Sequence, residues 1–293
     1  MALNKKHVLG CLAVVLLLLI VAAVLIAVYH PEWLKPPAPK QPTTPTTAPP
    51  SSTGPGRPLV LMTWNVRGYP EKDAATRTWF SKQLADLAPD VLCIQEISDQ
   101  SKITTFMAAE SRFTKYAFTD SGDGQDNAIF VDSAADIKPL ATPAGFQHPA
   151  AVAYVTSDGF DAVVVTVHLS WTDVSKRAHE KQLLRGVVAD ALKIDPDVIV
   201  TGDFNTQRPD IDELAADCGL KVLVPGNVAT AATTHAGSRY DWVLISPDLA
   251  SEEAIGAEIV SFSGSDLTTA KKASDHLPVR AQFSTDLRFK DRK

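Results

Sequence analysis

The sequence predicts an α/β (α+β) domain with about eight to ten strands, placed after one N-terminal transmembrane helix and a linker. Short runs rich in β-branched residues alternate with amphipathic helical segments. Several of these runs, such as residues 163–167, are apolar on both faces, which indicates sheets that are covered on both sides. The composition of the first 58 residues differs from that of the rest and sets the N-terminal part of the chain apart.

Residues 8–29 contain no charged side chain. A helix of that length spans about 33 Å, and the hydrocarbon core of a membrane is about 30 Å thick. Lys5 and Lys6 precede this run, so the positive-inside rule predicts a single-pass protein whose residues 1–7 are cytoplasmic and whose main domain lies outside. A cleaved signal peptide is the alternative. It is disfavoured because its apolar region is normally about 7–15 residues long.

Residues 30–58 are rich in Pro and Thr and cannot bury a core, which predicts an extended linker. Residues 59–293 form the predicted catalytic domain and hold 23 basic and 33 acidic residues, a net charge of −10. This acidic balance disfavours a large phosphate-binding face and suits a metal ion or a small substrate. Within this domain, Cys93 and Cys218 are predicted to be two buried thiols rather than a disulfide.

The secondary structure follows from caps and periodicity. Asp73 can cap a helix over residues 74–87. A second helix is predicted over residues 174–192, where apolar residues such as Leu184 and Val188 repeat at helical spacing. Strands are predicted at residues 59–64, 91–95, 127–131, 150–156, 161–167, 198–201, 240–245 and 277–283.

Polar side chains stand at the ends of these strands or directly before them. Strand ends aim side chains from several elements into one crevice, so these residues are expected to meet. All of them carry a carboxylate, a carboxamide or an imidazole, which a purely structural role does not require. They are Asn65, Glu96, His168, Asp203, Asn205, Asp241, Asp275 and His276.

This set of groups is suited to metal-assisted attack of water on a phosphoryl centre. Carboxylates without cysteine favour a hard ion, Mg²⁺ first, with Mn²⁺ or Ca²⁺ as alternatives. Asp203 and Asn205 point to one side, so one can orient a water and the other can donate to a developing oxyanion. Asp241 can hold the ring of His276 in one tautomer. The motifs of serine hydrolases, zincins and P-loop or dinucleotide-binding proteins do not occur in the sequence.

Six blocks that contain these residues resemble the endonuclease/exonuclease/phosphatase superfamily, in the order found in that family. The resemblance implies a DNase I-like four-layer sandwich of two packed mixed β-sheets flanked by helices. It also implies a divalent metal, usually Mg²⁺, and hydrolysis of a phosphate ester. The blocks are TWNVRG at 63–68, DVLCIQE at 90–96, VHL at 167–169, TGDFN at 201–205, YDWVLIS at 240–246 and SDHLPV at 274–279.

The resemblance also implies a role for each residue. Glu96 is similar to the principal metal ligand of the family, Asn65 lies beside it, and Asp275 matches a metal-linked carboxylate. The five catalytic residues implied are Asp203, which orients water, Asn205, which stabilises the phosphate, His276 with its partner Asp241, and the phosphate-contacting His168.

Within the family the chain is most similar to deoxyribonuclease I. Asp126 and Asn127 are implied as supporting residues, because Asp126 stands where that enzyme has a Glu that supports the second histidine. Arg67 is a third supporting residue, and it differs from the Asp of abasic-site endonucleases. Ser98 and Gly124 replace an Arg and a Tyr that contact DNA in the nuclease, which leaves the hydrolytic centre intact but weakens the case for DNA.

The sequence therefore predicts a membrane-anchored, extracytoplasmic, metal-dependent phosphodiesterase, with a monomeric catalytic domain and nucleic acid as its first substrate. A phospholipid or inositol-phosphate hydrolase is the alternative enzyme. A binding module that has kept the fold and lost turnover is the alternative from another class.

Overall fold

The computed structural model describes residues 56–223 and 232–286. The predicted transmembrane helix at residues 8–29 and the predicted linker up to residue 55 lie outside the described residues. Within the described ranges, no helix has both the length and the apolar character that crossing a membrane requires.

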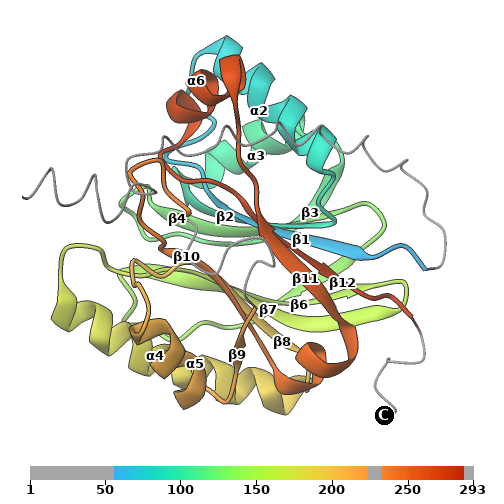
Figure 1. Ribbon diagram of the computed structural model, residues 1–293, viewed down its shortest axis with the longest axis vertical. Coiled ribbons are helices and arrows are strands. Elements are labelled where there is room, and N and C mark those ends of the chain that lie inside the picture. Colours follow the sequence, from blue (N-terminus) through green and yellow to red (C-terminus); the bar gives the residue numbers. More distant parts are fainter. Residues whose placement is uncertain (1–55, 224–231, 287–293) are drawn as a thin grey trace, which may run out of the picture. The chain divides into compact units, whose positions relative to one another are not determined.

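The first of two mixed sheets has six strands, of which β1 and β2 run parallel and the other neighbouring pairs antiparallel (Figure 1). Its strands, in spatial order, are β11 (Ala254–Ile259), β12 (Val279–Phe283), β1 (Leu59–Asn65), β2 (Val91–Ile97), β4 (Asp126–Asp132) and β3 (Phe113–Thr119).

The second sheet also has six strands, and here β7 and β8 form the parallel pair. The remaining neighbouring pairs are antiparallel. In spatial order, its strands are β5 (Asp136–Pro139), β6 (His148–Ser157), β7 (Phe160–His168), β8 (Val198–Asp203), β10 (Asp241–Ile245) and β9 (Lys221–Val222).

The fold has four layers, namely the two sheets and the helices outside each sheet, and three apolar clusters lie between these layers. The first cluster lies between the sheets, since it combines residues of β1, β2 and β4 with residues of β6, β7 and β8. The second fills the space between the second sheet and helices α4 (Val174–Ile194) and α5 (Asp210–Asp217). The third lies between the first sheet and helices α2 (Ala74–Leu87), α3 (Gln100–Ala109) and α6 (Gly264–Ala273), as Figure 1 shows. The predicted arrangement of two packed mixed sheets with helices outside is confirmed.

Both predicted helices are present, and each begins at an Asp cap. The carboxylate of Asp73 accepts from the backbone N–H of Thr76 at 2.8 Å, and that of Asp173 accepts from Lys176 at 2.9 Å. Several elements were not predicted from the sequence: α3, α5 and α6, a short π-helix at Leu249–Glu253, and the strands β3, β5, β9 and β11. Most of these elements are short or lie at a sheet edge, where the apolar pattern is weak.

The two cysteines of the described domain are free and buried, which confirms the prediction of two thiols. Burial raises the pKa of Cys218 to about 11 and raises the pKa of Cys93 well above its ordinary value. Neither sulfur is therefore a thiolate at neutral pH, and the site chemistry must come from other side chains.

Candidate active site

The register of the strands brings the predicted residues to one edge of the two sheets. Asp203, the last residue of β8, is paired with His168, the last residue of β7, on one side. On its other side Asp203 is paired with Asp241, the first residue of β10. In the facing sheet, Asn65 ends β1 and Glu96 lies near the end of the parallel strand β2. Asp203 is therefore the central carboxylate of the site.

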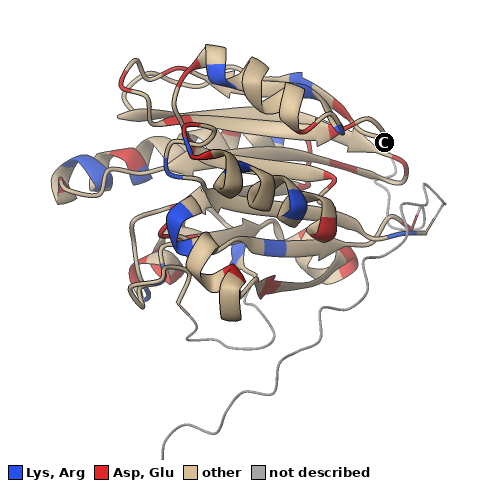
Figure 2. Cartoon of the chain, turned by 90° about the horizontal axis from the view of Figure 1, so that it is seen from above, with Lys and Arg blue, Asp and Glu red and all other residues tan. Residues whose placement is uncertain are grey.

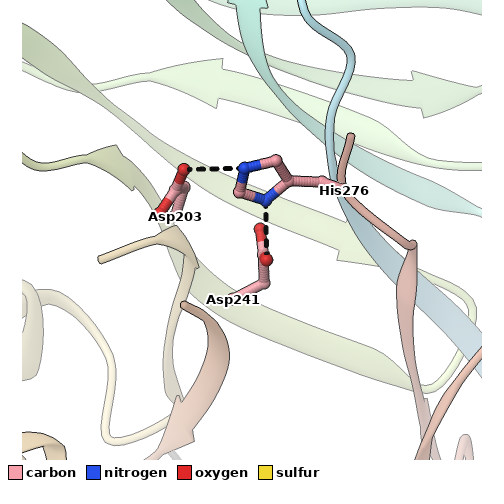
Figure 3. A group of neighbouring side chains, drawn as sticks. All are labelled: Asp203, Asp241 and His276. Carbon is pink, nitrogen blue, oxygen red and sulfur yellow. Dashed lines mark hydrogen bonds and ion pairs between the residues drawn. The ribbon is translucent and has the colours of Figure 1, made fainter. Parts of the chain in front are cut away.

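His276 bridges two of these carboxylates (Figure 3). Its Nδ1 lies 2.8 Å from Oδ2 of Asp241, and its Nε2 lies 3.6 Å from Oδ2 of Asp203. The backbone of His276 is held as well, because its N–H donates to Oγ of Ser274 at 3.0 Å. That hydroxyl donates in turn to the carbonyl of Asn65 at 2.6 Å. The imidazole is thus fixed at both its ring and its main chain.

The electrostatics of this group favour a charged imidazole. Burial alone would lower the pKa of His276, but the nearby carboxylates of Asp241, Asp203 and Asp275 raise it to about 10. Burial raises the pKa of Asp241, and the charge of His276 opposes that rise. We conclude that the proton shared by this pair resides on His276 at neutral pH.

A second set of contacts links Asn65 to two carboxylates. Its Nδ2 donates to Oε1 of Glu96 at 2.8 Å and to Oδ2 of Asp203 at 3.1 Å. Its Oδ1 accepts from the backbone N–H of Arg67 at 3.1 Å. Nε2 of His168 lies 3.8 Å from both Oε1 of Glu96 and Oδ2 of Asp203. Glu96, Asp203 and His168 therefore face one small volume.

The backbone is strained at this edge. Within the described residues, four non-glycine residues have a positive φ, and three of them belong to the site: Arg67 at 46°, Glu96 at 59° and Asn205 at 47°. Such conformations cost about 1–3 kcal/mol each and persist where the surrounding structure enforces them. Asn205 is enforced by two hydrogen bonds, from its N–H to Oδ1 of Asp203 and from its Nδ2 to the carbonyl of Leu169, both at 2.9 Å.

The residues present fit a divalent cation. Asp203, Asp241 and His276 each offer one ligand atom, and these atoms lie within 4.8 Å of one another. Glu96 adds a carboxylate oxygen beside Asp203, because both carboxylates accept from Nδ2 of Asn65. This oxygen-rich donor set suits a hard ion such as Mg²⁺ or Mn²⁺. His276 carries the proton of its bond to Asp241, so Asp203 is the member of this group that remains available to a cation, and it lies next to Glu96.

Other predicted residues lie at the margin. Asp275 is half exposed, and its Oδ2 lies 3.8 Å from Nη1 of Arg67. Asp126 is buried, but its Oδ1 accepts from the N–H and the hydroxyl of Ser121, at 2.7 and 2.6 Å. Among the described residues, no hydrogen bond joins Asp126 to His168, so the expected support is not formed. Asn127 donates from Nδ2 to the carbonyl of Pro149 at 3.0 Å.

Two residues of the site region were missed by the sequence analysis. The ring of His148 stacks on that of His168, and the buried carboxylate of Glu180 accepts from backbone N–H groups on both sides of this pair. The predicted strand at residues 150–156 leaves His148 out, whereas β6 begins at His148, and a register shift between His148 and Ala151 brings His148 opposite His168. That shift leaves no pattern in the sequence.

Solved structures with the same fold cover most of the chain. D. rerio TDP2 complexed with a single-strand DNA product is 19% identical, with a TM-score of 0.61 over 77% of this chain and 98% of that one. The human Nocturnin catalytic domain with a bound sulfate anion is 16% identical, with a TM-score of 0.60 over 78% and 94%. A Bacteroides thetaiotaomicron mannosyl-6-phosphatase is 16% identical, with a TM-score of 0.57 over 77% and 99%.

The sequence itself gives the family. No curated protein is similar enough to count as a match. The model of the Endonuclease/Exonuclease/phosphatase family matches residues 62–276, which is well over half of the chain and includes all the site residues described above. The chain therefore belongs to the Endonuclease/Exonuclease/phosphatase family and is a phosphoesterase hydrolase with a buried metal-site candidate at Asp203, Asp241 and His276.

Proposed function

We propose that the protein is a metal-dependent phosphodiesterase that hydrolyses nucleic acid. One observation carries the phosphodiesterase chemistry. Oδ2 of Asp203 lies 3.1 Å from Nδ2 of Asn65, 3.6 Å from Nε2 of His276 and 3.8 Å from Nε2 of His168. A buried carboxylate ringed by three donors can orient an attacking water next to groups that bind phosphate oxygens.

Each residue then has a defined task. Asp203 orients the water and accepts its proton, because its side chain is the central carboxylate of the site. His276, kept protonated by Asp241, donates to the phosphoryl oxygens and stabilises their charge. His168 faces the same volume and donates from Nε2. Asn205 donates a further hydrogen bond from its amide.

Glu96 and the shared Asp203 would hold the divalent cation, and Asn65 would orient their carboxylates through Nδ2. Asp275 would act from the margin of the site, next to Arg67. When bound, the cation would neutralise phosphate charge and polarise a P–O bond. The strained backbone at Glu96 fits this assignment, since strain of this kind collects at functional sites.

Two cations beside the site support a nucleic-acid substrate. Arg67 is more than half exposed, and Nζ of Lys72 donates to its carbonyl at 2.6 Å. Burial, with Arg67 as the next cause, lowers the pKa of Lys72. Figure 2 shows basic and acidic positions interspersed along the domain. A nucleic-acid strand would therefore be held locally, by Arg67 and Lys72, and not by a broad basic face. The DNA product bound to the distantly similar D. rerio TDP2 also favours this substrate.

A phospholipid substrate is the second candidate, favoured by an exposed apolar pair. Trp171 and Val174 follow the strand that ends at His168, and their exposed fractions are 65% and 69%. Exposed Trp and aliphatic side chains beside a site can insert into a lipid surface at the boundary between the headgroups and the acyl chains. The charge-free run at residues 8–29 fits this candidate too. We propose that it anchors the protein with its N-terminus in the cytoplasm and the catalytic domain outside.

The test is a substrate panel assayed with the purified full chain, with Mg²⁺ or Mn²⁺ and with Asp203→Asn as the inactive control. The panel holds plasmid DNA, RNA, phosphatidylinositol and sphingomyelin vesicles, and bis(p-nitrophenyl) phosphate. We expect cleavage of nucleic acid that Asp203→Asn abolishes. Cleavage of lipid with intact DNA and RNA would select the phospholipase candidate. Binding without turnover on the whole panel would leave only a non-catalytic binding module.

A further inference from the structure

The two site histidines are held by different means. The ring of His276 is fixed by its hydrogen bond to Asp241, the usual way of orienting an imidazole. Nδ1 of His168 is buried and has no hydrogen-bond partner within residues 56–223 and 232–286. Its Nε2 faces Glu96 and Asp203 at 3.8 Å, which is too long for a hydrogen bond. The orientation of the His168 ring must therefore come from packing.

His148 provides that packing. The two ring centroids are 4.7 Å apart, and the ring planes differ by 17°, so the imidazoles are stacked. Their backbones explain the stack, because His148 begins β6, His168 ends β7, and the two residues are directly paired across this antiparallel ladder. Side chains of such a pair lie next to each other on one face of the sheet. A register shift between His148 and Ala151 creates the pairing.

One buried carboxylate accepts hydrogen bonds from the backbone beside both stacked histidines. Glu180, on α4, is 0% exposed. Its Oε1 accepts from the N–H of Gln147 at 2.8 Å, directly before His148. Its Oε2 accepts from the N–H of Ser170 at 2.7 Å, two residues after His168. Charge-assisted hydrogen bonds of this kind are among the stronger ones, so both backbones are held at a fixed separation.

The next residue after His148 is also fixed, and from the other sheet. The carbonyl of Pro149 accepts from Nδ2 of Asn127 at 3.0 Å and from the hydroxyl of Thr119 at 2.6 Å. Nδ1 of His148 lies 3.4 Å from Oδ1 of Asp123, and the His148 side chain is fully buried. Neither ring nitrogen of His148 has a hydrogen-bond partner within the described residues. The ring is therefore confined by its complete burial and by its fixed backbone, and it offers its face to the ring of His168.

The charge state of His148 suits this position. Burial, with His168 as the second cause, lowers its pKa to about 4, and the nearby Asp123 only partly opposes this. The His148 ring is therefore neutral at neutral pH. A neutral ring can stack on His168 without repelling a proton that His168 needs in order to donate to phosphate.

We propose that His148 is a positioning residue, whose stacked ring holds the imidazole of His168 with Nε2 directed at Asp203 and Glu96. This role rests on the proposed function, because it assumes that His168 contacts the phosphate of the substrate. It replaces the support that the sequence suggested from Asp126, which bonds to Ser121 instead.

The test compares three variants of the full chain: His148→Ala, His148→Phe and the control His179→Ala, which removes an exposed histidine of α4. Turnover is measured with bis(p-nitrophenyl) phosphate. We expect His148→Ala to lower kcat by about 10- to 100-fold with KM little changed, since misplacing a reacting group by about 1 Å costs about that much. His148→Phe keeps a flat ring and should retain most of kcat, and His179→Ala should match the unsubstituted protein.

A spectroscopic measurement checks the stack without relying on activity. With histidines labelled by ¹³C, the ring protons of His168 should be shifted upfield by the ring current of His148. That shift should disappear in His148→Ala and persist in His148→Phe. Thermal unfolding shows whether each variant is folded. If His148→Ala does not fold, the spectrum of the unsubstituted protein alone still tests the stack.

The proposal is overturned by any of three results. These are a folded His148→Ala with kcat within twofold of the unsubstituted protein, equal losses in folded Ala and Phe variants, or unshifted His168 signals in the unsubstituted protein. Failure of the proposed function is a separate result, since the unsubstituted protein would then hydrolyse no phosphate ester while its His168 signals could still be shifted.

Discussion

Nδ1 of His276 and Oδ2 of Asp241 lie 2.8 Å apart, in a pocket that buries the carboxylate completely. On the far side of the ring, Nε2 lies 3.6 Å from Asp203 (Figure 3). Asp241 therefore determines both the orientation and the charge of the imidazole that faces the central carboxylate. A buried carboxylate in this position stabilises the imidazolium form by direct attraction.

Replacing any of the three residues Asp203, Asp241 and His276 should reduce turnover. His276→Ala and Asp203→Ala should each lower kcat by about 10²–10⁴-fold, the usual contribution of a positioned proton-transfer group. Asp241→Asn should lower kcat less, by about 10²-fold, because the ring stays in place while its charge is no longer stabilised. Steady-state kinetics on a generic phosphodiester gives these values.

Asp158→Asn is the matched control for these variants. Asp158 is an exposed turn residue between β6 and β7, and so lies at the opposite end of these strands from His168. Its substitution should leave kcat unchanged. Rates for Asp241→Asn and Asp158→Asn that agree within twofold would remove Asp241 from the mechanism.

Much of the fold was predictable because the core strands are strongly apolar. The runs that became β7 and β8 are fully buried and contain almost only β-branched residues in their interior. By contrast, α3 buries only Ile103 and Phe106, and β11 is an edge strand that buries little more than Ile259. Elements of this kind are stabilised by tertiary contacts that a local pattern does not encode.

The placement of the central side chains at one sheet edge was predictable, but the contacts that support them were not. Strand ends placed Asp203, Asp241 and His168 together, as the register confirms. The partner of His168 depended on a one-residue register shift that places His148 opposite it. Asp126 was expected as that partner because the resemblance places it where deoxyribonuclease I has a Glu that supports the second histidine. Its carboxylate instead satisfies the turn at Ser121, where two local donors are available.

Metal removal should abolish activity. Glu96 and Asp203 bring two carboxylates to the same amide of Asn65, and this concentration of negative charge is relieved by a divalent cation. EDTA should eliminate hydrolysis, and Mg²⁺ or Mn²⁺ should restore it. Activity that persists in EDTA would be incompatible with the proposed chemistry.

The same ion should stabilise the fold, and this measurement needs no substrate. At a concentration 100 times its Kd, a ligand that binds only the folded state adds about 2.7 kcal/mol of stability. Mg²⁺ should therefore raise Tm in the unsubstituted protein and much less in Glu96→Gln. The control is Glu252→Gln, which changes an exposed carboxylate of the π-helix. A Mg²⁺-induced rise that is equal in all three proteins would place the ion elsewhere.

Buried His148 predicts a loss of stability in acid. Its pKa is lowered to about 4 in the folded protein, from an unfolded value near 6.5, chiefly by burial. The unfolded chain therefore binds the proton first, so this contribution is fully present above about pH 6.5 and is lost as the pH falls toward 4. His148→Phe cannot take up the proton.

The urea midpoint of the unsubstituted protein should thus fall more steeply between pH 6.5 and 4 than that of His148→Phe. His179→Ala should keep the steep dependence, because it removes an exposed histidine and leaves the buried ring of His148 in place. Parallel curves for the unsubstituted protein and His148→Phe would show that the buried ring does not titrate in this range. The comparison is made in EDTA, so that metal release does not contribute.

Gly202 is required by the close approach of two strands next to the central carboxylate. It has a φ of +127° and is paired with Val167 on the parallel strand β7. A Cβ at this position would lie 2.2 Å from the carbonyl oxygen of Val167, which is backbone and cannot turn away. Gly202→Ala should therefore destabilise the protein by at least about 3 kcal/mol. Because Asp203 follows directly, any protein that still folds should also lose turnover.

Gly186 is the matched control and should respond in the opposite direction. It lies within α4, is exposed, and has no atom within 4 Å of where its Cβ would be. Gly186→Ala should stabilise the protein by about 0.5–1 kcal/mol, since glycine in a helix interior loses more backbone entropy than alanine on folding. Urea unfolding of both variants measures the two effects. A Gly202→Ala variant as stable as the unsubstituted protein would mean that the close contact between β7 and β8 is relieved by a shift of the strands, and that Asp203 is held less rigidly than its position implies.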